Sequence, residues 1–248
     1  FVVIGQEIDD AYMEELKKQI IHPEIIKEVA DELKIVYTPF HGTGNKPVRR
    51  ILAELGFKHV YVVPEQERPD PAFTTLDYPN PEDPKAFTLA LKLAKKVDAD
   101  IVLATDPDAD RLGIYAKDSK TGEYMPFTGN MSGMLIAEYI LRERTATNRM
   151  PVDPVMVSTI VTTNMAAAIA ADYNVELREV LTGFKYIGEQ IRRFEQDHSH
   201  HFVFGLEESY GCLVGTYAQD KDAVGAALLV AEMAACYKAK GQTLCDRL

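Results

Sequence analysis

The sequence predicts an α/β protein made of two tandem α/β domains, each with a mixed or parallel sheet covered by helices. Strand-like and helix-like segments alternate along the whole chain, which is typical of sheets with helices on their faces. A polar, proline-bearing stretch at residues 145–154 separates two such series and is the best candidate boundary. We therefore place the domains at residues 1–150 and 151–248.

The first series begins with two amphipathic helices, predicted at residues 9–19 and 23–33. The elements expected after them are strands at 34–38, 59–63, 99–104 and 112–116, and helices at 47–55, 83–96 and 130–144. Proline recurs throughout residues 64–84, which predicts a long irregular segment there. Such a long loop inside a compact domain is usually either functional or disordered.

The second series repeats this rhythm. Its expected strands lie at 155–159, 176–180 and 201–205, and its helices at 163–172, 187–196 and 222–240. Residues 243–248 look like the start of another helix, and residue 1 is not methionine. We therefore expect the chain to be a piece of a longer protein.

Composition and charge narrow the classes of partner. The net charge of −11 argues against nonspecific binding to nucleic acid or to an anionic membrane, so we expect neither partner. The sequence has no apolar run long enough to cross a bilayer. Its three cysteines lack metal-ligand spacing, which fits a reducing compartment, and we expect a cytoplasmic location.

The most informative segment is Thr-Asp-Pro-Asp-Ala-Asp-Arg at residues 105–111. Its carboxylates, Asp106, Asp108 and Asp110, follow a buried strand, at the edge where α/β sheets place their ligands. Because three such close carboxylates repel one another, we expect a hard divalent cation, Mg²⁺, between them. Arg111 follows directly and suits a phosphate held beside the metal. The alternative is a solvated turn, in which aspartate is common.

Two other loops lie between a strand and a helix. Residues 39–46 include His41, but their spacing fits neither the Walker A loop nor the dinucleotide fingerprint. A tight turn is as good an interpretation as a ligand contact, and His41 is kept as a candidate substrate contact. In residues 181–188, Lys185 is the only cation of an otherwise apolar run. A functional role for Lys185 is one interpretation, and the alternative is a surface lysine at the start of a helix.

The last loop of interest, residues 205–211, again follows a strand. Glu207, Glu208 and Ser209 are flanked by glycines and could accept or donate hydrogen bonds to the hydroxyls of a sugar. An exposed acidic turn is the alternative. Lys221 opens the final helix, where a cation opposes the helix dipole, and this placement hints at an anionic partner.

Together these segments resemble the α-D-phosphohexomutases, the superfamily of phosphoglucomutases and phosphomannomutases. The matching stretches, in chain order, lie at residues 37–42, 69–71, 105–111, 182–187 and 205–211. Such enzymes have four domains around one cleft, and this chain looks like domains 2 and 3. The implied fold is therefore phosphoglucomutase-like. Pro107 departs from the glycine often found there, which affects the path of the loop because proline fixes φ.

The resemblance also implies roles for individual residues. Asp106, Asp108 and Asp110 would hold Mg²⁺. Arg111 and Lys221 would be catalytic cations, and the substrate contacts would be Lys185, Glu207, Ser209 and His41. The implied reaction interconverts hexose 1-phosphate and hexose 6-phosphate through a phosphoserine and a bisphosphate intermediate. The serine loop and the phosphate-binding loop belong to domains 1 and 4, so we expect this piece to be inactive alone.

Other functions stay open from the sequence. Within the superfamily, a phosphomannomutase or a phosphopentomutase would carry similar motifs. Glycosyltransferases also bind metal through Asp-x-Asp, although the third aspartate and the arginine argue against one. Haloacid-type phosphatases use a similar pair, but near their first strand. A non-catalytic module that keeps the fold without the chemistry is the alternative of another class.

Overall fold

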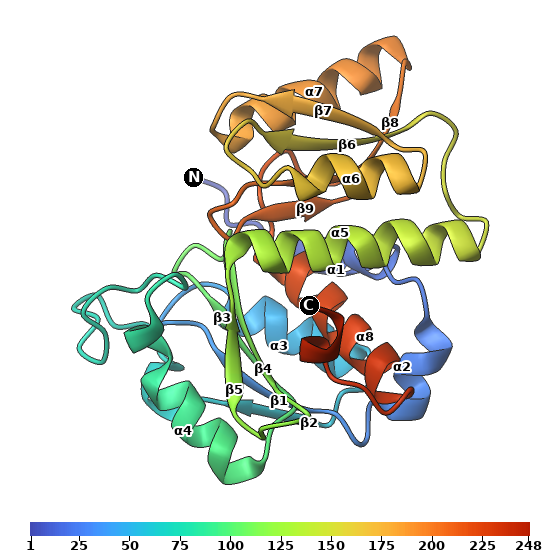
Figure 1. Ribbon diagram of the computed structural model, residues 1–248. Helices are drawn as coiled ribbons and strands as arrows, with labels where there is room; N and C mark the ends of the chain where they lie inside the picture. The colour runs from blue at the N-terminus through green and yellow to red at the C-terminus, as the bar shows by residue number, and fades with distance from the viewer.

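The computed structural model describes residues 1–248, which form two sheets with a layer of helices between them (Figure 1). The first sheet has the order β2-β1-β3-β4-β5 and the second the order β7-β6-β8-β9. Helix α5 (Gly129–Ala146) runs between the two halves (Figure 1). The two tandem α/β units expected from the alternating pattern are therefore confirmed. The exact domain boundary stays a prediction.

The first sheet is mixed. Its strands are β1 (Lys34–Thr38), β2 (His59–Val62), β3 (Ile101–Thr105), β4 (Leu112–Lys117) and β5 (Tyr124–Phe127). The first three are parallel, while β4 and β5 run antiparallel to their neighbours. Because β1 and β3 are parallel neighbours, the loops after them leave from the same edge of the sheet.

Each face of the first sheet is covered by different helices. On one face, the 3₁₀ turn η2 (Pro84–Phe87) and α4 (Thr88–Val97) pack on alternate residues of β1 and β3. The other face carries four helices: α1 (Gln6–Lys17), α2 (Pro23–Val29), α3 (Asn45–Glu54) and α8 (Ala223–Lys238). The alternation of side chains along each strand explains why two separate clusters form.

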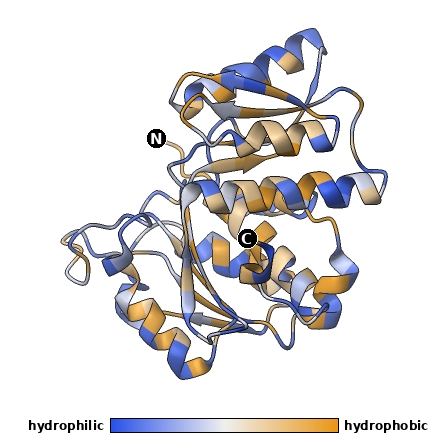
Figure 2. Ribbon diagram, in the orientation of Figure 1, coloured by the Kyte–Doolittle hydropathy of each residue, from blue (hydrophilic) through white to orange (hydrophobic).

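The second sheet is parallel apart from its last strand. Its strands are β6 (Pro154–Thr159), β7 (Glu176–Val180), β8 (His201–Leu206) and β9 (Cys212–Val214), of which β9 is antiparallel to β8. Helix α7 (Phe184–Asp197) covers the outer face, while α5 and α6 (Met165–Asp172) cover the inner one. Figure 2 shows α7 as largely hydrophilic and α6 as mainly apolar.

Helix α8 belongs to the second half by sequence but lies in the core of the first. Every residue from Ala223 to Tyr237 is buried, and the helix has no polar face. It packs against α2, α3, β3 and β4, as well as against β9 and α5. A helix that is apolar on all sides must be surrounded by protein. One continuous hydrophobic core therefore joins the two halves.

Most predicted elements are confirmed, and the differences have simple causes. Strands β5 and β9 were not expected, because one contains Pro126 and the other has only three residues. The helix predicted at 83–96 begins as the 3₁₀ turn at Pro84, and residues 244–247 form only a 3₁₀ turn, η3. Residues 64–84 are irregular, as expected, apart from the turn η1 (Pro64–Gln66). No helix combines the length and apolar character that a membrane span requires.

Glu232, on α8, is an acidic side chain within the buried core between the halves. It is fully buried, and its Oε1 accepts hydrogen bonds from the backbone N–H groups of Ile21 (2.8 Å) and His22 (2.5 Å). Its Oε2 has no partner. Burial raises the pKa of this carboxyl above its ordinary value of 4.5, although the two N–H bonds oppose the shift.

The raised pKa of Glu232 predicts a pH-dependent stability. The folded state holds the proton of the Glu232 carboxyl more tightly than the unfolded chain does. The stability that this protonation contributes is therefore complete below pH 4.5 and is lost as the pH rises through the folded-state pKa. Glu232→Gln keeps the acceptor oxygen and cannot ionise. In urea unfolding at pH 5 and pH 8, the variant should gain stability relative to wild type at the higher pH. Glu28→Gln, on the exposed side of α2, is the control, and an equal pH response in both variants would contradict the prediction.

Candidate functional site

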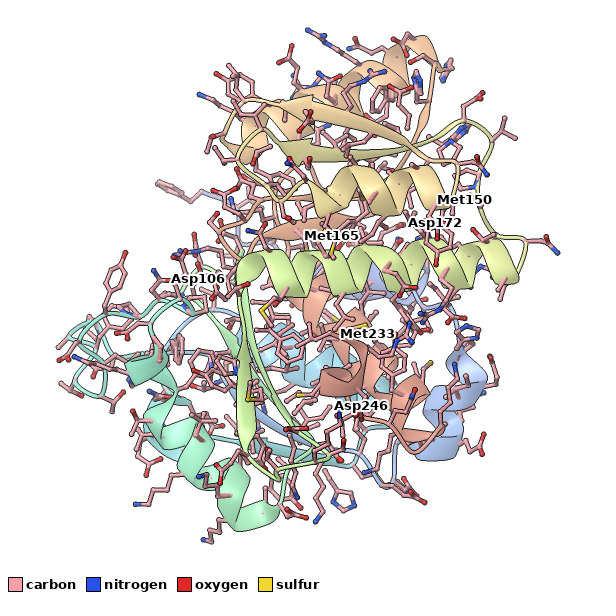
Figure 3. The ribbon with its side chains drawn as sticks, in the orientation of Figure 1. Asp106, Met150, Met165, Asp172, Met233 and Asp246 are labelled. Atoms are coloured by element: carbon pink, nitrogen blue, oxygen red, sulfur yellow. The ribbon has the colours of Figure 1, made fainter.

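The acidic loop at residues 105–111 and the loop at residues 206–211 meet where the two sheets come together. Arg111 and Gly211 form an antiparallel bridge, and the N–H of Leu112 donates to the carbonyl of Tyr210 at 3.0 Å. The N–H of Ala223, the first residue of α8, donates to the carbonyl of Ala109 at 3.0 Å. Figure 3 places Asp106 at the end of the first sheet, beside the start of α5. The two loops are therefore joined directly by backbone hydrogen bonds.

The three aspartates of the acidic loop lie together. One carboxylate oxygen from each of Asp106, Asp108 and Asp110 lies within 4.8 Å of the others. Ala109 has a positive φ of 61°, and this left-handed residue turns the chain between the second and third carboxylates. Asp108 is exposed and has no hydrogen-bond partner, while Asp106 is only 1% exposed. All the ligand atoms that these three aspartates could offer a metal ion are carboxylate oxygens.

Asp106 is held firmly by its own loop. Its Oδ1 accepts from the N–H groups of Asp110 (3.1 Å) and Arg111 (2.9 Å), and its Oδ2 accepts from Arg111 Nε at 2.7 Å. Burial raises the pKa of Asp106 to about 6, the neighbouring charge of Asp110 adds to this, and the Arg111 bonds oppose it. A cation beside the loop would relieve the repulsion between the two carboxylates.

Lys221 links the acidic loop to the second half of the chain. Its Nζ lies 3.0 Å from Asp110 Oδ2 and 3.8 Å from Glu207 Oε2, and it sits 5.5 Å from the centre of the Phe184 ring. Burial lowers the pKa of this lysine, but the Asp110 hydrogen bond and nearby charges outweigh burial and raise it. A Cβ on Gly211 would lie 2.0 Å from Lys221 Cδ, so the glycine makes room for the lysine stem.

Glu207 joins two loops of the second sheet. Its Oε1 accepts a hydrogen bond from the N–H of Gly183 at 2.9 Å. Gly183 has a φ of 116°, which only glycine adopts readily, and it is the N-cap residue that precedes α7. Burial raises the pKa of Glu207, and Lys221 opposes the shift. Lys185 is exposed and lies 5.1 Å from the centre of the Tyr186 ring, while Ser209 is half-buried without a hydrogen-bond partner.

The loop at residues 39–46 packs directly against the acidic loop. The N–H of Thr43 donates to the carbonyl of Pro107 at 2.8 Å, and a Cβ on Gly42 would lie 2.4 Å from Pro107 Cα. His41 is buried, and its ring nitrogens bond to the carbonyl of Arg68 and the hydroxyl of Thr75, both at 2.8 Å. The histidine therefore ties two loops together. The sequence did not show what path the acidic loop takes at Pro107. The contacts of Pro107 with Gly42 and Thr43 define that path.

The structure brings some of the candidate residues together and leaves others apart. Those in mutual contact are Asp106, Asp110, Arg111, Glu207 and Lys221, with Asp108 beside them. His41, Lys185 and Ser209 form no hydrogen bond or ion pair with this group. Sequence reasoning missed Asn80 and Glu82, which contact Arg111 from the proline-rich segment. That segment was expected to be functional or disordered, but no single residue in it was chosen.

Two models of known protein families match this chain. Residues 10–121 match the family model described as phosphoglucomutase/phosphomannomutase, alpha/beta/alpha domain II, and residues 128–248 match the model for domain III. The chain belongs to the phosphoglucomutase/phosphomannomutase family. The resemblance drawn from the motifs, including the restriction to the two central domains, is therefore confirmed.

Relatives of this family are similar along nearly the whole chain. A phosphoglucomutase from Staphylococcus epidermidis (strain ATCC 12228) is 40% identical over 217 residues, which cover 88% of this chain and 38% of that protein. One from Staphylococcus aureus (strain USA300) is 37% identical over 243 residues, covering 98% and 42%. The chain thus spans about two-fifths of the length of the curated relatives it matches.

Solved structures share the fold at lower identity. A putative phosphomannomutase from Thermus thermophilus superposes with a TM-score of 0.75 at 21% identity, covering 97% of this chain and 49% of that one. A phosphoglucomutase/phosphomannomutase family protein from Burkholderia thailandensis gives a TM-score of 0.66 at 20% identity, covering 88% and 43%. These likenesses confirm the phosphoglucomutase-like fold.

Proposed function

We propose that this chain is the metal-binding and sugar-binding part of a phosphoglucomutase-type enzyme, which interconverts hexose 1-phosphate and hexose 6-phosphate. The observation that carries the proposal is the position of Lys221, between Asp110 of the acidic loop and Glu207 of the second sheet. A single cation between those two carboxylates brings a candidate metal site and a candidate sugar site into one place. The names of the curated relatives favour glucose over mannose or pentose phosphates.

The donor set fits Mg²⁺. Carboxylate oxygens are the ligands that a hard cation prefers, and three of them lie within 4.8 Å of one another. Asp108 is exposed and free of partners, so its carboxylate is available, while the hydrogen bonds on Asp106 fix its orientation. We assign Asp106, Asp108 and Asp110 as the ligands. When bound, the ion would neutralise negative charge on a phosphoryl oxygen.

The remaining residues have roles that follow from their contacts. The guanidinium of Arg111, anchored through Nε to Asp106, would bind equatorial phosphate oxygens, where charge needs stabilising during transfer. Lys221 would hold anionic groups at the junction and is a candidate for moving a proton to or from a sugar hydroxyl. Glu207 and Ser209 would bind sugar hydroxyls in both orientations of the substrate, with Lys185 as a further candidate contact. His41, whose two ring nitrogens are already bonded within the protein, would act through the loops it joins.

The proposal extends to the parts of the enzyme outside this chain. The phosphoserine and the substrate-phosphate loop would come from domains 1 and 4 of the same polypeptide, consistent with the fraction of the relatives that the chain spans. We expect no nucleic-acid or membrane partner, since the net charge of the chain is −11. We expect a cytoplasmic location because the three cysteines fit a reducing compartment.

Turnover by the full-length enzyme tests this proposal. Glucose 1-phosphate, with a trace of the 1,6-bisphosphate and Mg²⁺, should yield glucose 6-phosphate in an assay coupled to its dehydrogenase. EDTA should abolish the reaction and added Mg²⁺ should restore it, because the acidic loop needs its cation. Residues 1–248 alone should give no turnover. Full-length enzyme that is inactive on hexose and pentose phosphates alike, or activity unaffected by EDTA, would overturn the assignment.

A further inference from the structure

We propose that Asn80 and Glu82, in the proline-rich segment at residues 64–84, are positioning residues that aim the Arg111 guanidinium at the phosphate. The proposal rests on the proposed function, because it concerns the orientation of a group assigned to phosphate binding there. Neither residue belongs to one of the five family-like motifs, and both lie about thirty positions before Arg111 in the chain. Their contacts with it are visible only in the folded molecule.

The contacts place Arg111 between two anchors. Its Nε donates to Asp106 Oδ2 at 2.7 Å, and its Nη1 donates to Asn80 Oδ1 at 3.3 Å. The Nη1 atom also lies 3.7 Å from Glu82 Oε1. Nη2 has no hydrogen-bond partner in the protein. Because the guanidinium is planar, anchoring it at Nε and Nη1 fixes the direction of the remaining N–H groups.

Asn80 is itself held in place by its backbone surroundings. Its Oδ1 also accepts from the N–H of Glu82 at 3.0 Å, and its carbonyl accepts from the N–H of Asp83 at 3.0 Å. One oxygen thus closes a local turn and binds the arginine. These two hydrogen bonds fix the direction of the Asn80 side chain, although Asn80 lies in neither a helix nor a strand.

Pro81 fixes the turn against the first sheet. It is buried, and a Cβ added to Gly113 would lie 2.8 Å from Pro81 Cβ. Gly113 is the second residue of β4 and lies two positions after Arg111. The glycine lets the proline approach the strand closely, which brings Asn80 and Glu82 beside the guanidinium. The irregular segment is therefore fastened where it contacts Arg111.

A long arginine side chain that is 26% exposed would otherwise sample several rotamers. The anchors remove that freedom before the substrate arrives, which is how preorganisation contributes to catalysis. Glu82, which is exposed, lies 3.7 Å from Nη1, and Asp106 accepts a hydrogen bond from Nε. The positive charge of Arg111 is therefore balanced by the proline-rich segment as well as by the acidic loop. We infer that Asn80 has the larger effect, because it makes the hydrogen bond.

The experiment compares matched variants of the full-length enzyme. Asn80→Ala should lower kcat about tenfold and leave KM for the sugar phosphate within about twofold, because misplacement affects the transition state most. Asn80→Asp keeps the acceptor oxygen and should restore most of the activity. The control is Asp118→Ala, since Asp118 Oδ1 closes the same kind of turn, accepting from Lys120 N–H at 3.0 Å, at the far end of β4.

Two further measurements separate positioning from general damage. In an Arg111→Lys background, Asn80→Ala should cause no additional loss, because its effect passes through the guanidinium. In residues 1–248 alone, the Nε–Hε NMR signal of Arg111 should broaden or shift in Asn80→Ala and stay unchanged in Asp118→Ala. Equal kcat values for Asn80→Ala and Asp118→Ala in an active enzyme, or an unchanged Arg111 signal, would overturn the inference. An inactive wild-type enzyme would instead count against the proposed function, and the NMR signal would still decide whether Asn80 orients Arg111.

Discussion

Replacing Asp108 by alanine should lower turnover by the full-length enzyme roughly 100- to 1,000-fold, a range typical for loss of one charge-stabilising group. The carboxylate of Asp108 is exposed and bonds to nothing in the chain, so its removal leaves no buried group without a partner. Thermal stability should therefore stay close to that of wild type. The coupled assay measures the activity, and electron paramagnetic resonance of Mn²⁺ measures whether the metal site has weakened.

A suitable control is Asp172→Ala, at the end of α6, because Asp172 is another exposed carboxylate without a partner (Figure 3). It should change neither Mn²⁺ binding nor turnover. Asp108→Ala with full activity and unchanged Mn²⁺ affinity would remove the metal role from the acidic loop. Lost stability without lost affinity would show that Asp108 supports the fold instead.

The largest effect on stability is expected from Gly129→Ala. Gly129 is the first residue of α5, and a Cβ there would lie 1.7 Å from the carbonyl oxygen of Glu208. The added atom would meet backbone, so no side-chain rotation relieves the clash. We expect a loss of about 3 kcal/mol, at the upper end for overpacking, and a melting temperature lower by roughly 6–12 °C.

Thermal unfolding followed by circular dichroism measures this loss. Gly5→Ala is the control, because a methyl group added at Gly5 would have no atom within 4 Å and the residue has a negative φ. It should melt within about 1–2 °C of wild type, as expected for an exposed site. Because Glu208 adjoins Glu207, Gly129→Ala should also displace the loop at residues 206–211, the proposed sugar contact, and reduce activity in the full-length enzyme. Equal melting temperatures for the two variants would show that the loop at residues 206–211 can move to accept the methyl group without loss of stability.

The acidic loop could be predicted because its information is local. A buried strand followed by Asp106, Asp108 and Asp110 predicts where the three carboxylates lie, and the structure brings them within 4.8 Å of one another. Their binding of a metal ion stays a prediction. The bounds of β1 were likewise clear from a short apolar run that ends before Pro39. Strand β9 could not be predicted, since three residues are too few to show the alternating pattern of a strand.

The contacts made by Asn80 and Glu82 were beyond sequence reasoning for a different reason. They depend on how an irregular segment folds back over β4, and no periodic pattern records such a path. The placement of α8 was equally hidden. Its apolar sequence predicts burial, but does not tell which of the two sheets it covers.

The burial of α8 in the first half has a consequence for biosynthesis. The strands of the first sheet are complete once Phe127 has been translated, yet α8, one of the four helices on the face opposite α4, ends at Lys238. At a synthesis rate of roughly 5–20 residues per second, the sheet must wait several seconds or longer on the ribosome with apolar surface uncovered. Ribosome-bound chains that stop before α8 should therefore recruit chaperones, and the two halves should reach their native packing together.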